Sequence, residues 1–212
     1  MLLNKNKASE LIKLLNKSIK NPKTSLKYRN KFTLLTSVVL SAQCTDVNVN
    51  NVTKDIYNKY YTPEHFVDLG INRIKNLIKS IGLFNNKAKN LYYLSKILLE
   101  KYQSKVPNKF EELILLPGVG RKTANVVLNE AFNKPTIAVD THVFRVGNRT
   151  GLSNSKNPEQ VENQLLKTLP KKHIKKAHHL ILLHGRYTCK SRNPLCKICV
   201  INKICLYKGK NE

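Results

Sequence analysis

Long apolar runs are missing from this sequence of 212 residues. A helix that spans a membrane needs roughly 18–20 apolar residues in succession, and no stretch approaches that length. The N-terminal segment also lacks the apolar core of a secretion signal. We therefore expect a cytoplasmic protein, with a transit peptide as the alternative interpretation of the basic, amphipathic residues 2–20.

Strand signals and low-complexity signals are scarce as well. Glycine and proline occur only 8 times each, which excludes a fibrous chain, while hydrophobic residues make up 41%, as in globular domains. Before the middle of the chain nothing alternates with period two over a useful length, and no internal repeat is visible. Helical periodicity is frequent instead, so we predict an all-α protein, and a chain of this length has room for two modest domains.

The helices expected before residue 103 are marked by apolar spacing, by prolines and by capping residues. They cover residues 8–19 and 32–42, a segment capped by Thr45 or Asp46, a segment starting at Pro63, and residues 71–81 and 87–102.

Acidic residues are few: 13 Asp and Glu stand against 38 Lys and Arg, which gives a net charge of +25. A surface this basic attracts phosphate polymers through counterion release, so nucleic acid is the first partner to consider. Genome bias is the alternative, because 31 of the cations are lysine and 25 asparagines accompany them, as an AT-rich coding sequence would give. The arginines are more informative, and five of them follow residue 120: Arg121, Arg145, Arg149, Arg186 and Arg192.

A proline and two glycines interrupt the apolar pattern near the middle of the chain. Residues 110–116 have helical spacing, and Pro117 ends that short helix. Gly118 and Gly120 allow a tight turn whose backbone N–H groups an anion can approach closely. A second helix follows, and its polar residues are expected on the side opposite the core: Lys122, Asn125 and Asn129.

The segment Leu-Pro-Gly-Val-Gly-Arg-Lys-Thr-Ala at residues 116–124 resembles the helix-hairpin-helix of the DNA glycosylase superfamily. The resemblance implies that this hairpin, about residues 110–132, grips a DNA phosphate through the backbone amides of its turn. The DNA-contact residues implied for the turn are Gly118, Val119, Gly120 and Arg121. The lysine at position 122 resembles the pattern of the bifunctional glycosylase/AP lyase branch, whose members have a catalytic lysine at the matching position.

Lys122 can act as a nucleophile only as the neutral amine, and an ordinary lysine pKa of about 10.4 leaves roughly one side chain in a thousand neutral at pH 7. The positive end of its helix, the adjacent Arg121 and desolvation against DNA would each lower that pKa. Asp140 can then accept or place the proton. On the residues alone Asp140 is a simple helix cap, and its catalytic role is implied by the match of residues 138–143 to the family.

The reaction that the resemblance implies is excision of oxidised pyrimidines from duplex DNA in base excision repair. The damaged base is flipped out, because the sugar C1′ cannot be reached while the base is stacked. Lys122 would expel the base and form a Schiff base, Asp140 would support positive charge on the sugar, and β-elimination would cut the strand 3′ to the abasic site. Gln43, in a second family match at residues 39–43, would fill the gap and contact the orphaned base.

Five cysteines are present, and four of them lie within 17 residues near the C-terminus. Cys44 stands alone where the family pattern has a small residue, and we expect a packed free thiol. The other four have the spacing C-x6-C-x2-C-x5-C: Cys189, Cys196, Cys199 and Cys205. Because the sequence has no secretion signal, four cysteines this close together indicate a metal centre and not a pair of disulfides. The chemistry of cysteine alone allows either zinc or an iron–sulfur cluster. The spacing matches the cluster loop of the glycosylase/lyase family, which implies a [4Fe–4S] cluster.

Charged side chains lie close to these cysteines in the sequence. Lys190 and Arg192 fall between the first two ligands, where a loop pinned by metal can hold them against DNA phosphates. Three histidines precede the loop, and we expect them at the surface or beside the ligands, not among the ligands: His178, His179 and His184.

The resemblance covers nearly the whole chain and implies an all-α fold of two helical domains with a DNA-binding groove between them. A helical barrel at 24–134 would contain the hairpin, and residues 1–23 with 135–212 would form a discontinuous iron–sulfur domain with its cluster loop at 189–205. The partner would be double-stranded DNA with damaged bases or abasic sites, bound by a monomer. Two alternatives are a mismatch adenine DNA glycosylase, which lacks the lysine and has a further C-terminal domain, and a non-enzymatic zinc-bound DNA-binding module.

Overall fold

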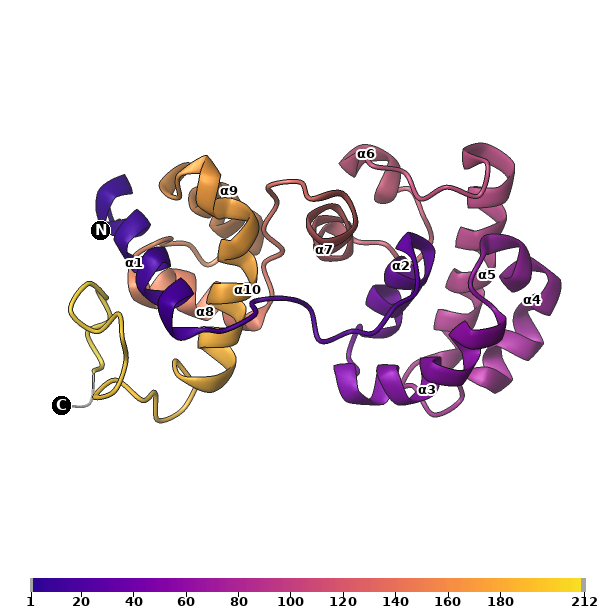
Figure 1. Cartoon of the computed structure of the whole chain (residues 1–212), viewed down its shortest axis with the longest axis horizontal. Coiled ribbons are helices and arrows are strands. Elements are labelled where there is room, and N and C mark those ends of the chain that lie inside the picture. Colours follow the sequence, from indigo (N-terminus) through magenta and orange to yellow (C-terminus); the bar gives the residue numbers. More distant parts are fainter. Residues whose placement is uncertain (1, 211–212) are drawn as a thin grey trace. The chain divides into compact units, whose positions relative to one another are not determined.

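The computed structural model describes residues 2–210, and within these residues it contains ten α-helices and no strand (Figure 1). The prediction of an all-α fold is confirmed. The chain divides into two compact units, one of Ser25–Phe132 and one of Met1–Thr24 with Asn133–Glu212. None of the helices in the described part is both long and apolar enough to cross a membrane.

The unit of Ser25–Phe132 contains six helices. They are α2 (Lys31–Leu40), α3 (Asp46–Lys59), α4 (Pro63–Leu77), α5 (Phe84–Tyr102), α6 (Phe110–Leu113) and α7 (Arg121–Phe132). Every residue of α2 after Lys31 is buried, because the helix carries no charged side chain after Lys31 and lies inside the unit. Two of its buried hydroxyls share a partner, since Thr36 Oγ1 and Ser37 Oγ each lie 2.8 Å from the Tyr57 hydroxyl of α3.

Two local signals in this unit behave as the sequence predicts. Thr45 caps α3 by accepting a hydrogen bond from the Asn48 amide, and Pro63 occupies the first turn of α4. Gly70 has φ +66° and ψ 165°, so α4 is kinked there and its second half starts at Ile71. Helices α4 and α5 pack side by side (Figure 1).

The hairpin helix α7 corrects one expectation. Asn125 and Asn129, expected on the side opposite the core, are only 3% and 2% exposed. Ala124, Val127 and Leu128 are buried as expected, so α7 is covered on more than its apolar face. Helical periodicity identifies which residues share a face, but it does not say how many faces are covered.

The second unit contains α1 (Lys5–Ser18), α8 (Thr141–Thr150), α9 (Pro158–Thr168) and α10 (Lys171–Tyr187). Its core is built from the apolar faces of these helices, with Leu11, Leu15, Val146 and Leu180 fully buried. Helix α10 packs against α8 and α1. Helix α10 comes close to α8 at Gly185, where a Cβ atom would lie 2.9 Å from His142 Cβ.

Candidate functional site

The hairpin turn is shaped by hydrogen bonds and by buried side chains. The Leu116 amide donates to Leu113 O at 3.1 Å, and the Val119 amide donates to Leu116 O at 3.0 Å. The side chains of these three residues are buried, so the turn is anchored from inside. Val119 therefore sets the shape of the turn, because its amide is used within the protein and its side chain is buried.

The two glycines of the turn have different surroundings. Gly118 has φ +78°, and a Cβ atom there would lie 2.8 Å from Asn90 Nδ2 and 3.0 Å from Asn90 Cβ on α5. Gly120 is in an ordinary region of backbone space, and a Cβ atom there would meet nothing within 4 Å. Gly118 is thus required by the fold of the turn, whereas Gly120 leaves an open surface.

Arg121 and Lys122 begin α7, and both side chains are exposed. The Arg121 guanidinium lies 5.1 Å from the centre of the Phe110 ring, so it folds back over α6 in a cation–π contact. Lys122 stands at the positive end of the helix, next to that guanidinium in the sequence.

Gln43 lies in the turn between α2 and α3 with an exposed side chain. Its φ of +54° is left-handed, which is uncommon for a residue with a side chain. The turn is closed by the Cys44 amide, which donates to Ser41 O at 3.1 Å. Cys44 is a half-buried free thiol packed against the core, and Asn48 Nδ2 lies 3.2 Å from its Sγ.

Leu83 is a large apolar residue that the sequence did not single out. It precedes α5 with φ +60° and is 57% exposed. A Cβ atom on its neighbour Gly82 would lie 3.9 Å from Gln43 O, so the two turns are adjacent. The sequence does not predict that Leu83 is exposed beside Gln43, because the spacing of apolar residues does not show whether a single leucine outside a helix is buried.

Asp140 is the N-cap of α8, in the other unit. Its Oδ1 accepts a hydrogen bond from the Val143 amide at 2.7 Å, which is the geometry of a helix cap. The cap hydrogen bond uses one of the two carboxylate oxygens.

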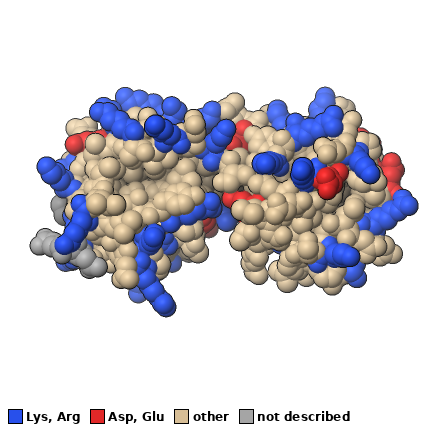
Figure 2. All heavy atoms as spheres, turned by 60° about the horizontal axis from the view of Figure 1, so that its bottom comes forward, with Lys and Arg blue, Asp and Glu red and all other residues tan. Residues whose placement is uncertain are grey.

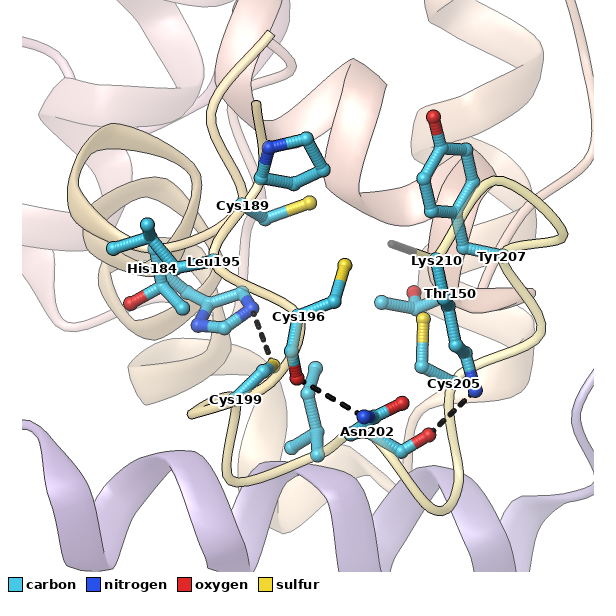
Figure 3. Close-up of a pocket in the computed structure, with 13 residues that line it drawn as sticks. Thr150, His184, Cys189, Leu195, Cys196, Cys199, Asn202, Cys205, Tyr207 and Lys210 are labelled. Atoms are coloured by element: carbon cyan, nitrogen blue, oxygen red, sulfur yellow. Dashed lines mark hydrogen bonds between the residues drawn. The ribbon is translucent and has the colours of Figure 1, made fainter. Parts of the chain in front are cut away.

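All four C-terminal cysteines line one small pocket, and Figure 3 shows them around it with His184 at the end of α10 and Thr150 at the end of α8. All four are free thiols. The space between the lining residues is about 340 Å³, part of which opens to solvent. Burial raises the pKa of the Cys199 and Cys205 thiols.

The cysteines share a pocket without converging on a point. Among residues 2–210, no three His, Cys, Asp or Glu side chains lie close enough to hold a single metal ion. With Zn–S bonds of about 2.3 Å, the sulfurs around one zinc ion lie roughly 4 Å apart. Four thiols around one pocket are a donor set that either zinc or a [4Fe–4S] cluster takes from a protein.

Two arginines on α8 hold the start of this loop. Arg145 donates to Cys189 O at 3.0 Å and to Gly185 O at 2.8 Å. One turn later, Arg149 donates to Lys190 O at 2.6 Å, to Ser191 O at 2.9 Å and to Cys189 Sγ at 3.6 Å. These guanidinium groups donate to the protein's own backbone, so both arginines hold the loop in place.

Unlike the two arginines of α8, the two cations of the loop that are predicted to contact DNA have exposed side chains. Lys190 and Arg192 are exposed, on a segment whose carbonyls are fixed by Arg149. On the face shown in Figure 2, Lys and Arg side chains are spread over both units and acidic side chains are few.

Three histidines of α10 are buried, so the expectation of a surface position is wrong for His178, His179 and His184. Burial lowers the pKa of His179 and of His184 to about 4. His184 Nε2 lies 3.7 Å from Cys199 Sγ (Figure 3). His184 therefore lies beside one of the predicted ligands, as expected for these histidines. The basic residues of α10 lie on its exposed side, and the histidines share the buried side.

The sequence matches the family model for the HhH-GPD superfamily base excision DNA repair protein over residues 36–171. The match spans more than half of the chain, so the chain belongs to this superfamily.

Relatives within the superfamily are similar over almost their whole length. Endonuclease III of Rickettsia conorii is 55% identical over 94% of this chain and 95% of its own, and that of Escherichia coli K12 is 49% identical over 98% and 99%. A solved trapped endonuclease III–DNA covalent intermediate, an estranged-adenine complex, matches with a TM-score of 0.90 and 42% identity over 96% of each chain. The chain is thus a member of the endonuclease III family and an enzyme of base excision DNA repair, as the resemblance predicts.

Proposed function

We propose that this enzyme is a bifunctional DNA N-glycosylase and AP lyase that removes oxidised pyrimidines from duplex DNA. The observation that carries the proposal is the exposed Lys122, presented at the N-terminal end of α7 directly after a glycine turn suited to a phosphate. A solved relative is a covalent intermediate between endonuclease III and DNA, which supports a protein nucleophile.

Lys122 is the proposed nucleophile of both steps. Its neutral amine attacks C1′, the bond between C1′ and the damaged base breaks, and the base leaves with the electron pair and is protonated. Opening of the sugar ring then gives a Schiff base between the lysine nitrogen and C1′. The imine acidifies the C2′ proton, and its removal expels the 3′ phosphate by β-elimination. Hydrolysis of the imine restores the amine.

Asp140 is the proposed electrostatic and proton-transfer group. Its Oδ1 is held by the Val143 amide, so the carboxylate has a fixed direction before substrate binds. A pre-oriented negative charge stabilises the cationic sugar better than a mobile one, because no reorganisation is needed during reaction. The same carboxylate can carry the proton that leaves C2′.

We further propose that Cys189, Cys196, Cys199 and Cys205 hold a [4Fe–4S] cluster. When bound, the cluster supplies iron–thiolate bonds that tie the loop together, a structural contribution. The loop then presents Lys190 and Arg192 to DNA phosphates. We infer that residues 24–134 act as the helical barrel domain, that the remaining residues form the cluster domain, and that the enzyme binds damaged double-stranded DNA as a monomer.

Trapping with borohydride tests the catalytic proposal. Reduction of the imine joins enzyme and DNA irreversibly, so the wild-type enzyme should give a protein–DNA adduct with a duplex containing an abasic site. Lys122→Ala should give none, and Lys109→Ala, at an exposed lysine beside the same hairpin, should react like the wild type. An adduct with Lys122→Ala would reject the assignment. Iron and sulfide analysis tests the cluster, and zinc without sulfide would reject it.

A further inference from the structure

Lys87 is a buried lysine whose role the proposed reaction does not explain. It lies in the first turn of α5 and is 4% exposed. Its Nζ donates to Leu40 O at 2.9 Å and to Ala42 O at 2.6 Å. Burial lowers its pKa, and the proximity of the Cys44 thiol acts in the opposite direction. The buried ammonium is thus bound by backbone carbonyls, which carry the partial negative charge of a helix C-terminus.

The two acceptors lie on either side of the end of α2. Leu40 is the last residue of that helix, and Ala42 directly precedes Gln43. Since Gln43 has a left-handed backbone, its conformation must be held by its surroundings. The Lys87 ammonium fixes the carbonyl immediately before it, and so determines the direction in which the chain enters Gln43.

A second set of contacts holds the far side of the same turn. Asn48 Nδ2 lies 3.2 Å from Cys44 Sγ and donates to Ser80 O at 3.3 Å. The backbone of Gln43 lies against Gly82. The Gln43 turn is therefore placed against the residues that lead into α5, and the Lys87 ammonium binds it from α5 itself.

Helix α5 supports the hairpin as well. Asn90 lies one turn after Lys87 on the same side of the helix, and its side chain packs against Gly118. Two adjacent side chains of one rigid helix therefore contact the two loops to which DNA contacts are assigned. Such an arrangement fixes the spacing between the Gln43 turn and the hairpin turn.

We propose that Lys87 is a positioning residue for Gln43: through the carbonyls of Leu40 and Ala42 it holds the glutamine amide where it enters the gap of a flipped nucleotide. The inference rests on the proposed function, because it assumes that Gln43 contacts DNA. Lys87 itself touches no substrate and acts through the backbone of the turn.

The test compares Lys87→Met, which keeps length but has no donor, with Lys89→Met at an exposed position of the same helix. In single-turnover excision of an oxidised pyrimidine by the full-length enzyme, we expect Lys87→Met to be roughly tenfold slower, as for a misplaced active-site group. Lys89→Met should stay within about twofold of the wild type. A rate for Lys87→Met equal to that of Lys89→Met would overturn the proposal.

A double-mutant cycle separates positioning from stability. If Lys87 acts through Gln43, Lys87→Met should slow the Gln43→Ala enzyme by no more than about twofold. Additive effects would show that Lys87 supports the fold generally and would reject the proposal. Should Lys87→Met fail to fold, Lys87→Gln, which retains an amide donor on a shorter chain, is compared under the same criterion.

Hydrogen exchange gives a readout that does not depend on activity. The amides of residues 41–45 should exchange faster in Lys87→Met than in the wild type, while those of residues 34–39 remain protected. Unchanged exchange at 41–45 would contradict the proposal. Failure of the proposed function would appear elsewhere, as a wild-type enzyme that forms no borohydride adduct.

Discussion

The side chain of Asn90 packs directly against Gly118, and a Cβ atom at Gly118 would lie 2.8 Å from Asn90 Nδ2. Gly118 also has φ +78°, so alanine there is strained as well as crowded. We expect Gly118→Ala to lower the free energy of unfolding by about 1–3 kcal/mol, and to weaken DNA binding because the turn changes shape. Urea unfolding followed by circular dichroism measures the first effect, and fluorescence anisotropy with a duplex measures the second. An unfolding free energy equal to that of the wild type would show that the turn adapts.

Gly120 provides the matched contrast within the same turn. A Cβ atom there meets no protein atom within 4 Å, so Gly120→Ala should leave the unfolding free energy within about 0.5 kcal/mol of the wild type. DNA affinity should still fall, because the methyl group stands where a phosphate approaches the backbone amides. The prediction therefore separates folding from binding at one position. Unchanged affinity would remove Gly120 from the DNA contacts.

Local chemistry explains why much of this fold could be predicted. Pro63, Thr45 and Asp140 act within a few residues of themselves, and each begins a helix or caps one as the sequence indicates. The spacing of apolar residues predicts which side of α7 enters the core. Such signals need no knowledge of the rest of the chain.

Long-range partners explain what could not be predicted. Lys87 is buried because carbonyls more than 40 residues earlier bind its ammonium, and a single lysine in a helix carries no sign of this. The same holds for Arg149, whose partners lie more than 40 residues later in the cluster loop. The roles of Lys122 and Asp140 come from family resemblance, and they remain predictions until tested.

Arg149 should control how well the loop of residues 189–205 retains the proposed iron–sulfur cluster. Its guanidinium donates to two carbonyls and to the Cys189 sulfur, and its Cζ lies 4.5 Å from the centre of the Tyr207 ring. Arg149→Met removes these donors and leaves the carbonyls without them, so we expect the enzyme to lose iron severalfold faster in a chelator. Visible absorbance over time measures the loss. Retention equal to that of the wild type would show that the thiolates alone hold the loop.

Arg192 should behave in the opposite way, because its side chain is exposed. Arg192→Met is expected to keep its iron and to bind DNA more weakly. The slope of log affinity against log salt should fall by about 1, as for the loss of one phosphate contact. Titrations at several salt concentrations measure this slope. A slope unchanged by the substitution would remove Arg192 from the DNA contacts.

His179 should make the fold sensitive to acid. Burial lowers its pKa from 6.5 to about 4, and the side chain is 5% exposed. The unfolded chain therefore binds a proton at His179 below about pH 6.5, whereas the folded protein binds it only near pH 4. Protonation thus favours the unfolded state between these pH values, and the free energy of unfolding falls by up to about 3 kcal/mol as the pH decreases from 6.5 to 4. We expect the thermal midpoint of the wild type to fall between pH 7 and pH 5, and to fall less in His179→Gln. Differential scanning calorimetry over this range measures both slopes, and equal slopes would show that protonation of His179 does not drive the loss.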